Sequence, residues 1–314
     1  MYIKQCCLSP ILFVGCACLI MPSSASAVEY AYGTYGLGSS AFGAGVTPPP
    51  GTYVTEGLFY FRGTIGTAVQ FGDDILNAGG KATLFSEATN ILYVPERKLF
   101  GGNMGLSLTV PVNFVDYSGT LTGPLNNSIT RSVDGWGMGD VVSRFQLGWQ
   151  LGDFSHLFYV QAVAPTGHWE RGFEPITGFY RPGVDTGWAF TWTDRKKVVQ
   201  LNGTVGFTFN AENTATNYQN GNEFHFEWAA GMEIAPGLII GVVGYDYRQI
   251  TNDSGSGDTI GPFVGRVDAV GPGLSYTTLI GTTPVVFNMR HYQEFNGENH
   301  FHGNSSIVSL TVRY

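Results

Sequence analysis

The sequence predicts an all-β protein, a transmembrane antiparallel β-barrel of about twelve strands. Apolar and polar side chains alternate with a period of two in many segments, as at Val205, Phe207 and Phe209. Charged residues form 13% of the chain, where about 25% is usual, and its 44 glycines are about twice the usual share. The last alternating segment ends on an aromatic residue, Tyr314.

A helical membrane protein is excluded by the lengths of the apolar runs. Beyond the N-terminal region the best candidate, residues 238–245, stops far short of the ~20 residues that a membrane helix requires. Only helices and closed barrels satisfy their backbone hydrogen bonds in hydrocarbon. If this chain spans a bilayer, it therefore does so with strands.

Residues 1–27 have the pattern of a secretory signal peptide. Lys4 supplies the positive start, residues 11–21 the apolar stretch, and Ala-Ser-Ala at 25–27 a small-residue cleavage site. The mature chain is then expected to begin at Val28.

All four cysteines, at positions 6, 7, 16 and 18, lie in that segment. The mature chain therefore has no thiol for a disulfide, a zinc–thiolate site or a cysteine nucleophile. Lipoprotein cleavage before Cys16 is an alternative, which Phe13 disfavours because such sites prefer Leu there.

The charge balance of the mature chain is acidic. Lys4 is the only charged residue of 1–27, and its removal leaves 15 basic against 24 acidic residues, a net charge of −9. This balance argues against nucleic acid as a partner.

Residues 28–50 form a Gly/Pro-rich segment ahead of a barrel that we expect to occupy residues 51–314. Fully extended, these 23 residues reach about 75 Å, enough to thread a barrel lumen. Two interpretations remain open, a plug inside the barrel and a loose periplasmic tail.

The alternation places the twelve strands and the connections between them. The predicted strands are residues 53–62, 82–94, 104–115, 139–151, 156–164, 187–193, 200–210, 222–234, 238–249, 263–279, 284–295 and 303–314. Short connections, such as 152–155 and 235–237, suit periplasmic turns, whereas the long polar ones suit external loops. We expect two of these loops, 116–138 and 165–186, to control access to the lumen.

Aromatic residues are expected to form girdles at the two membrane interfaces. Trp188 and Trp192 are four residues apart, so either their strand begins before residue 187 or one of them lies outside a girdle. The residues predicted at the outer rim are Phe114, Phe209, Phe224, Tyr245 and Tyr247, and those at the periplasmic rim are Trp149 and Tyr314.

The final strand alternates apolar and polar residues up to the terminal Tyr314. This pattern is typical of the C-terminal signal that the barrel-insertion machinery recognises, and we expect that machinery to be a partner. A soluble edge strand that ends on an aromatic residue is the alternative.

Five segments together resemble the meta-pathway phenol-degradation family of outer-membrane proteins, which includes a sphingosine-induced porin. They are Pro-Pro-Pro-Gly-Thr-Tyr at 48–53, Ala-Pro-Thr-Gly at 164–167, Asn-Tyr-Gln-Asn-Gly-Asn-Glu-Phe-His at 217–225, the stretch from Gly-Tyr-Asp-Tyr-Arg-Gln to Asp-Ser-Gly-Ser-Gly at 244–257, and Val-Gly-Pro at 270–272. Each motif is weak alone, but they follow the family's order. The resemblance implies an outer-membrane barrel associated with uptake of aromatic or lipid-like compounds.

Charged residues on the polar faces of the strands are the candidates for a pore lining. Two interpretations remain, an open or gated pore with a transverse field and a lumen closed by ion pairs. The candidates are Glu56, Arg62, Asp140, Arg144, Glu223, His225, Glu227, Asp246, Arg248, Arg266, Asp268, Arg290 and Glu294.

Pro272, after Gly271, falls inside a predicted strand, where proline removes a ladder hydrogen bond. An ordinary bulge is the favoured interpretation, and a lateral exit into the membrane is the alternative.

The sequence predicts no metal site, no cofactor and no catalytic residue. The histidines lack metal-ligand spacing, and a polar loop explains Asp253 and Asp258 better than a calcium site does. No serine and histidine share a strand face with a carboxylate, so an enzyme is not expected.

Together these patterns predict a protein of the bacterial outer membrane that works as a channel or carrier. Its expected partners are outer-membrane lipid and a small-molecule solute. The alternative is a structural or surface barrel that conducts nothing.

Overall fold

A computed structural model describes residues 32–71, 74–122, 127–170, 175–194, 198–258 and 264–314; the side chains of residues 67–77 are outside this description. The predicted signal peptide, residues 1–27, lies outside the described residues. Within them, no helix is long and apolar enough to cross a bilayer.

The described residues form one antiparallel sheet of fourteen strands. The strands are β1 (Gly51–Phe71), β2 (Asp74–Val94), β3 (Lys98–Leu99), β4 (Gly102–Thr122), β5 (Ser128–Met138), β6 (Val141–Leu151), β7 (Phe154–Ala164), β8 (Gly183–Asp194), β9 (Val199–Asn210), β10 (Glu223–Ala235), β11 (Leu238–Gln249), β12 (Arg266–Ile280), β13 (Thr283–Glu298) and β14 (His302–Arg313).

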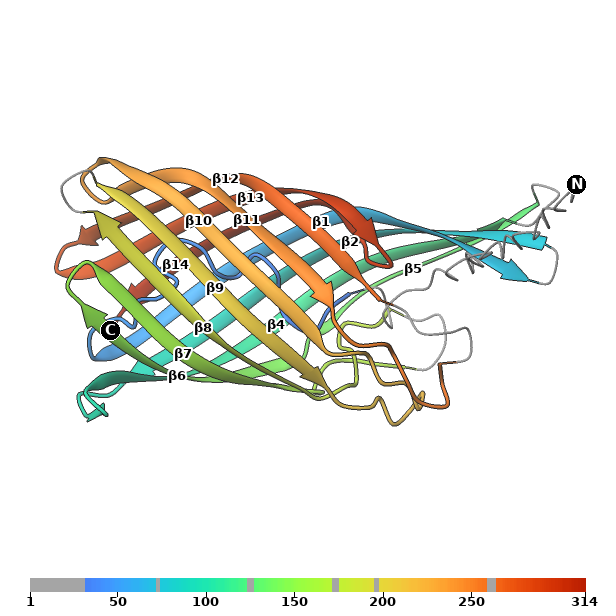
Figure 1. Cartoon of the computed structure of the whole chain (residues 1–314), viewed down its shortest axis with the longest axis horizontal. Helices are drawn as coiled ribbons and strands as arrows, with labels where there is room; N and C mark the ends of the chain where they lie inside the picture. Colours follow the sequence, from blue (N-terminus) through green and yellow to red (C-terminus); the bar gives the residue numbers. More distant parts are fainter. Residues whose placement is uncertain (1–31, 72–73, 123–126, 171–174, 195–197, 259–263) are drawn as a thin grey trace, which may run out of the picture.

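The sheet closes on itself because β1 pairs with β14, from Tyr53 opposite Arg313 to Thr64 opposite His302. β5 and β6 follow one another along β4 and share one position in the wall, and the short β3 pairs only with the start of β4. The described wall is therefore a closed antiparallel barrel of twelve strand positions, which confirms the predicted fold (Figure 1).

The two ends of the barrel differ, as Figure 1 shows. The C terminus and the tight turns lie at one end, and two of these turns use glycine with φ of 64°, at Gly152 and Gly281. The long connections, including those after β9 and β11, lie at the other end. Because turns face the periplasm in such barrels, the end with long connections is extracellular.

Two hairpins run far beyond the barrel at the extracellular end (Figure 1). β1 and β2 remain paired up to Phe71 and Asp74, and β4 and β5 up to Thr122 and Ser128. The predicted loop 116–138 is therefore wrong, because most of it is strand. Its polar, glycine-containing sequence suggested a loop, but a hairpin surrounded by water can be polar on both faces.

The outer wall carries the apolar half of the alternation. Phe158, Val160 and Phe207 are 54%, 48% and 41% exposed on this face. A water-soluble monomer rarely exposes such a continuous apolar surface, whereas a lipid-covered barrel requires it. Trp188 and Trp192 both belong to this face because β8 begins at Gly183, four residues earlier than predicted.

Tyr245 and Tyr247 depart from the predicted outer girdle. They are 3% and 0% exposed and belong to the apolar cluster inside the barrel. The Tyr245 hydroxyl donates to the carboxylate of Glu294 in the lumen, a partner that lipid would not supply.

The strand around Pro272 keeps its register. Val270 pairs with Gln293 and Gly273 pairs with Arg290, so no residue is inserted between them. The irregularity of β12 lies instead between Arg266 and Asp268. The bulge predicted at Pro272 is therefore wrong, and the unchanged register gives no support to a lateral exit there.

Candidate functional site

The barrel interior has two unlike halves. Residues 34–45 of the N-terminal segment run inside the barrel and bond to side chains of β8, β9, β10 and β13. The opposite wall, formed by β1, β2, β4, β6 and β7, faces a cavity of about 680 Å³ beside that segment. The interior is therefore filled on one side and hollow on the other.

Three ionisable side chains point inward from β10. Glu223, His225 and Glu227 are each at most 1% exposed, because Phe224 and Phe226 between them face outward. The period of two along this strand thus places three polar groups in a row about 7 Å apart on the lumen wall.

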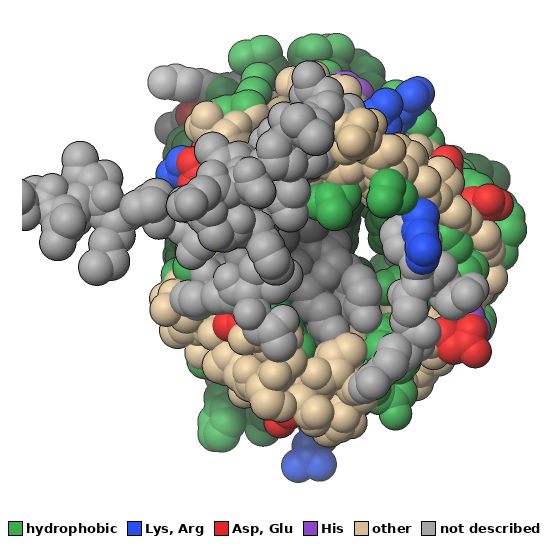
Figure 2. Space-filling view, turned by 90° about the vertical axis from the view of Figure 1, so that its right-hand side faces the viewer, with side chains coloured by type: hydrophobic (Ala, Val, Ile, Leu, Met, Phe, Trp, Pro, Cys, Tyr) green, Lys and Arg blue, Asp and Glu red, His purple; other side chains and the backbone are tan. Residues whose placement is uncertain are grey.

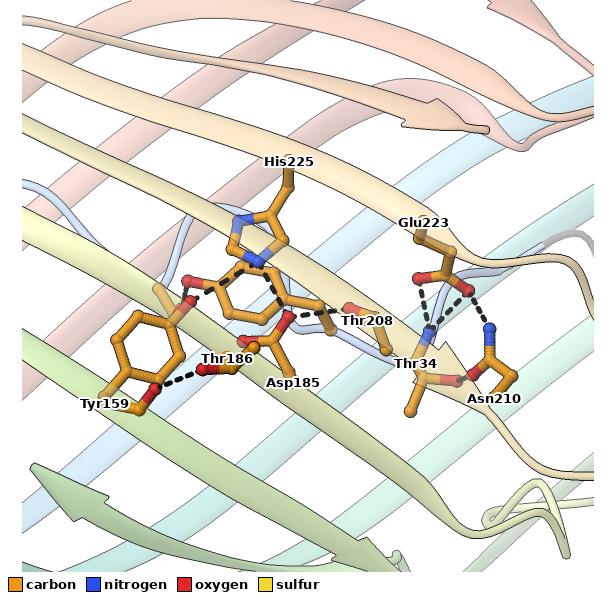
Figure 3. Close-up of polar contacts among 10 residues, drawn as sticks. Thr34, Tyr159, Asp185, Thr186, Thr208, Asn210, Glu223 and His225 are labelled. Atoms are coloured by element: carbon orange, nitrogen blue, oxygen red, sulfur yellow. Dashed lines mark hydrogen bonds and ion pairs between the residues drawn. The ribbon is translucent and has the colours of Figure 1, made fainter. Parts of the chain in front are cut away.

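The two glutamates hold the backbone of the N-terminal segment. The Thr34 N–H donates to both carboxylate oxygens of Glu223, at 3.4 and 3.3 Å, and the Ser40 N–H donates to Glu227 at 2.9 Å. Asn210 also donates to Glu223, at 2.9 Å (Figure 3). These buried carboxylates are stabilised by N–H donors, as burial of a charge requires.

His225 forms the centre of a second polar cluster (Figure 3). Its Nε2 lies 3.0 Å from Oδ2 of Asp185, which also accepts a bond from the Thr208 hydroxyl at 2.7 Å. The ring of Tyr35, from the N-terminal segment, stacks on the imidazole with centroids 3.6 Å apart. The Tyr159 hydroxyl approaches the same Nε2 at 3.5 Å.

Two arginines contact carbonyl groups of the segment. Arg290 Nη1 donates to the carbonyls of Gly38 and Ser39 at 2.8 and 3.1 Å. Arg181 Nη2 donates to the Tyr32 carbonyl at 2.8 Å. Carboxylates thus bind the N–H groups of the segment and guanidinium groups bind its carbonyls, which fixes its direction along the wall.

A carboxylate ties the extracellular loops together. Asp253 is 4% exposed and accepts bonds from the Tyr218 hydroxyl at 2.5 Å, the Gly221 N–H at 2.7 Å and the Gln249 amide at 2.7 Å. Burial raises the pKa of Asp253 above its ordinary value, and these donors oppose that rise. Its bonds are those of a loop anchor, as the polar-loop interpretation expects.

The loop between β13 and β14 buries His300 against the start of the segment. The imidazole stacks on Tyr32 with centroids 5.8 Å apart and contacts Tyr247 at 5.0 Å. Burial lowers the pKa of His300 to about 4. This ring is therefore neutral at pH 7.

The hollow side of the lumen is lined mainly by neutral polar and apolar groups. Asp140 is buried there, and its two oxygens accept the N–H groups of Gly167 and Phe179 at 2.9 and 2.8 Å. Arg144 places its guanidinium 4.0 Å from the centroid of the Tyr159 ring. The neutral polar side chains that line the cavity include Thr55, Ser86, Asn90, Ser107, Thr109, Asn113, Gln146, Gln161, Asn288, Ser309 and Thr311.

The structure divides the predicted pore-lining residues into two groups. Seven lie inside the barrel: Asp140, Arg144, Glu223, His225, Glu227, Arg290 and Glu294. Six lie on the outer face or its extracellular rim instead: Glu56, Arg62, Asp246, Arg248, Arg266 and Asp268.

On β11 the tyrosines occupy the inward positions, which turns the charges outward. Arg248 Nη2 lies 2.6 Å from the Asp246 carboxylate and 2.8 Å from that of Asp268, which is opposite Asp246 on β12. These positions are near the extracellular strand ends, where headgroups and water solvate paired charges. Arg266 pairs with Glu298 at the same rim.

On β1 the inward positions belong to Thr55, Phe59 and Phe61. Glu56 and Arg62 consequently point outward, and Glu56 accepts a bond from Thr89 on β2 at 2.9 Å. The assumption that every charged strand residue faces the lumen fails here, because aromatic side chains fill part of the interior.

Two interior residues escaped the sequence analysis, Asp185 and Arg181. Both lie in the stretch 165–186 that was predicted as a loop, although Asp185 belongs to β8. The alternation of Asp185 with Gly187 and Ala189 could have revealed its inward direction. Arg181 precedes the strand, and no periodic signal marks it. Among the described residues, no group of three or more metal-ligating side chains comes together.

A closed barrel with an apolar exterior, periplasmic turns and a polar interior defines an integral protein of the bacterial outer membrane with a channel-type fold. Its outer surface meets lipid. Residues 41–310 match the family described as "Putative MetA-pathway of phenol degradation", and the chain belongs to this family. The resemblance found in the sequence motifs is thereby confirmed.

A solved structure shows the same architecture. An outer-membrane channel from Pseudomonas putida F1 superposes with a TM-score of 0.61 at 14% identity, over 87% of this chain and 98% of that one. The CymD monoaromatic hydrocarbon channel is aligned over 93% of this chain and 98% of its own, with a TM-score of 0.44 at 8% identity. No curated protein matches the sequence.

Proposed function

We propose that this protein is an outer-membrane channel or carrier for small aromatic or lipid-like solutes, and that it performs no covalent chemistry. The observation that carries the proposal is the cavity of about 680 Å³ inside a closed barrel, between the N-terminal segment and the β1–β7 wall. A cavity of this size lies in the range of small-molecule sites. Its mixture of hydroxyl, amide and apolar groups suits a solute with an apolar body and a few polar atoms.

The proposal includes a role for the N-terminal segment. Glu223 and Glu227 accept hydrogen bonds from its backbone and Arg290 donates to it, which supports a plug that limits the passage. Figure 2 looks onto the extracellular end, where the coloured side chains show scattered acidic and basic groups around the rim. Solutes would reach the cavity from this end, past the described loops 175–182 and 211–222.

Planar-bilayer recording of the purified protein tests the channel. Ion-carrying steps support it, and a persistently silent bilayer supports the alternative, a structural or surface barrel. Liposome-swelling rates with benzyl alcohol and with a sugar of similar size test the preference for aromatic bodies. Faster entry of the sugar would contradict the proposed solute class.

We also propose that β14 and Tyr314 present the signal for the barrel-insertion machinery. Tyr314 is 78% exposed at the end of the closing strand, next to the β1 edge that β14 must join. Tyr314→Ala should lower the amount of folded barrel in cells, whereas Tyr93→Ala, which removes another exposed tyrosine at that end, should not. Equal losses in both variants would contradict a specific signal.

A further inference from the structure

Arg144 is a cation on the cavity wall. It lies on β6 between Ser107 of β4 and Gln161 of β7, which are its register partners, and all three residues line the cavity. Within the described part of the chain it forms no ion pair with a carboxylate. Its Nε is buried and has no hydrogen-bond partner there.

Other arginines of the barrel have polar partners. Arg290 and Arg181 donate to backbone carbonyls of the N-terminal segment, and Arg248 is paired with two carboxylates. Among the described residues, the contact of the Arg144 guanidinium is the face of the Tyr159 ring, at 4.0 Å from the centroid. A cation–π contact uses none of the N–H donors at the edge of the guanidinium plane.

Among the described residues, no carboxylate lies within ion-pairing distance of Arg144. Asp140, the acidic residue of the cavity lining, already accepts two backbone N–H groups with its two oxygens. The neighbours of Arg144 on both adjacent strands are a hydroxyl and an amide, which carry no charge. The guanidinium therefore presents unused donors to the cavity.

The rest of the cavity limits the size and character of a ligand for these donors. Leu92, Val142 and Leu157 provide apolar surface on the same wall, and Phe42 provides it on the segment. A carboxylate matches the planar fork of a guanidinium and forms two parallel hydrogen bonds with it. An apolar or aromatic body would then lie against the aliphatic side chains.

We propose that Arg144 forms the head-group site of the cavity and selects solutes that combine a carboxylate with an aromatic or aliphatic body. The inference rests on the proposed function, since it names the solute class of the same lumen. Benzoate is the simplest probe, and benzyl alcohol has the same ring without the charge.

Calorimetric titration of the mature protein in detergent tests the site directly. Wild-type protein should bind benzoate, and Arg144→Gln should bind it about ten- to a hundredfold more weakly, the loss for hydrogen bonds to a charged group. Arg144→Lys should fall between them, because it keeps the charge but loses the fork. The matched control is Arg62→Gln, which removes an arginine from the outer face of β1 and should leave binding unchanged.

The outcomes separate this site from the proposed function. Failure of wild-type protein to bind benzoate, or equal binding by folded Arg144→Gln, overturns the anion site even if solutes cross the barrel. Binding that depends on Arg144 in a protein that passes no solute retains the site and overturns the channel. Binding of benzyl alcohol as tight as that of benzoate would show that the ring, and not the charge, is recognised.

Discussion

At the scale of single residues, the interior shows how a buried aspartate and histidine are held together. Asp185 and His225 are almost fully buried, yet Asp185 also accepts the Thr208 hydroxyl, and Tyr35 covers the imidazole. These contacts offset part of the cost of burying polar groups in the barrel interior. If one partner is removed, the other stays buried without its hydrogen bond.

Asp185→Ala leaves His225 and Thr208 without this acceptor and is therefore expected to destabilise the folded barrel by about 1–3 kcal/mol. Urea unfolding in lipid vesicles, followed by tryptophan fluorescence, measures the change. Asp246→Ala removes a carboxylate from a part-exposed pair on the outer face and should cost less than about 1 kcal/mol. Equal effects of the two substitutions would contradict the buried pair as a source of stability.

His300 predicts a pH effect at the extracellular end. Its pKa is lowered to about 4 in the folded loop, against about 6.5 in an open one. The open loop therefore takes up a proton first as the pH falls through 6.5. The free energy that favours loop closure is fully present above pH 6.5. It decreases progressively as the pH falls to 4, by roughly 3 kcal/mol in total.

Hydrogen exchange of residues 299–303, corrected for the intrinsic rate, measures this opening at pH 7.5 and at pH 5. Protection should fall at the lower pH in wild-type protein. His300→Phe keeps a ring to stack on Tyr32 and should retain its protection at both values. A pH dependence that persists in this variant would assign the effect to another group.

At the scale of elements, the wall formed by β1 and β2 carries an unexpected pair of acids. Glu56 and Glu87 are exposed on the outer face, among Val54, Leu58 and Ile91. The exposed aromatic residues Tyr60 and Tyr93 lie on either side of them along the strands, so both acids lie in the apolar belt. Charged groups on a lipid face lower barrel stability in a depth-dependent way.

Glu87→Leu is thus expected to stabilise the barrel in lipid vesicles, by less than the roughly 2–4 kcal/mol that a basic residue costs at the bilayer midplane. Urea titration in lipid vesicles provides the measurement. Glu96→Leu, in the exposed turn after β2, removes an acid outside the belt and serves as the control. Loss of stability in Glu87→Leu would mean that a polar contact, and not lipid, faces this position.

At the scale of the whole molecule, the period of two was enough to predict the barrel. β11 was predicted at residues 238–249 and has those bounds, and the short periplasmic turn before Leu238 fixes its start sharply. The distal part of the hairpin β4–β5, residues 116–138, was predicted as a loop, since polarity alone does not separate a water-exposed strand from a loop. The prediction that charged side chains face the lumen was also wrong at Glu56 and Asp246, because neighbouring aromatic side chains occupy the inward positions.

The contacts of the N-terminal segment lay beyond sequence reasoning for a different reason. Its backbone N–H and carbonyl groups make the bonds to Glu227 and Arg290, and a sequence does not show where backbone groups will be used. Length and composition left the plug and the tail equally open. A plug forms only if the lumen wall offers enough hydrogen-bond donors and acceptors to the segment. Their positions depend on how the strands assemble into the barrel.

A deletion of residues 32–46 tests the consequence for the whole barrel. If the segment restricts the lumen, its removal joins the filled half of the interior to the cavity, and single-channel conductance should rise severalfold. A matched control replaces the same residues with a Gly/Ser sequence of equal length, which keeps the chain but loses Tyr35, Leu37 and the other buried contacts. Conductance of this control should fall between the wild-type and deleted forms, because a mobile tether blocks the lumen only part of the time. Equal conductance of all three proteins would show that solutes follow a path that the segment does not narrow.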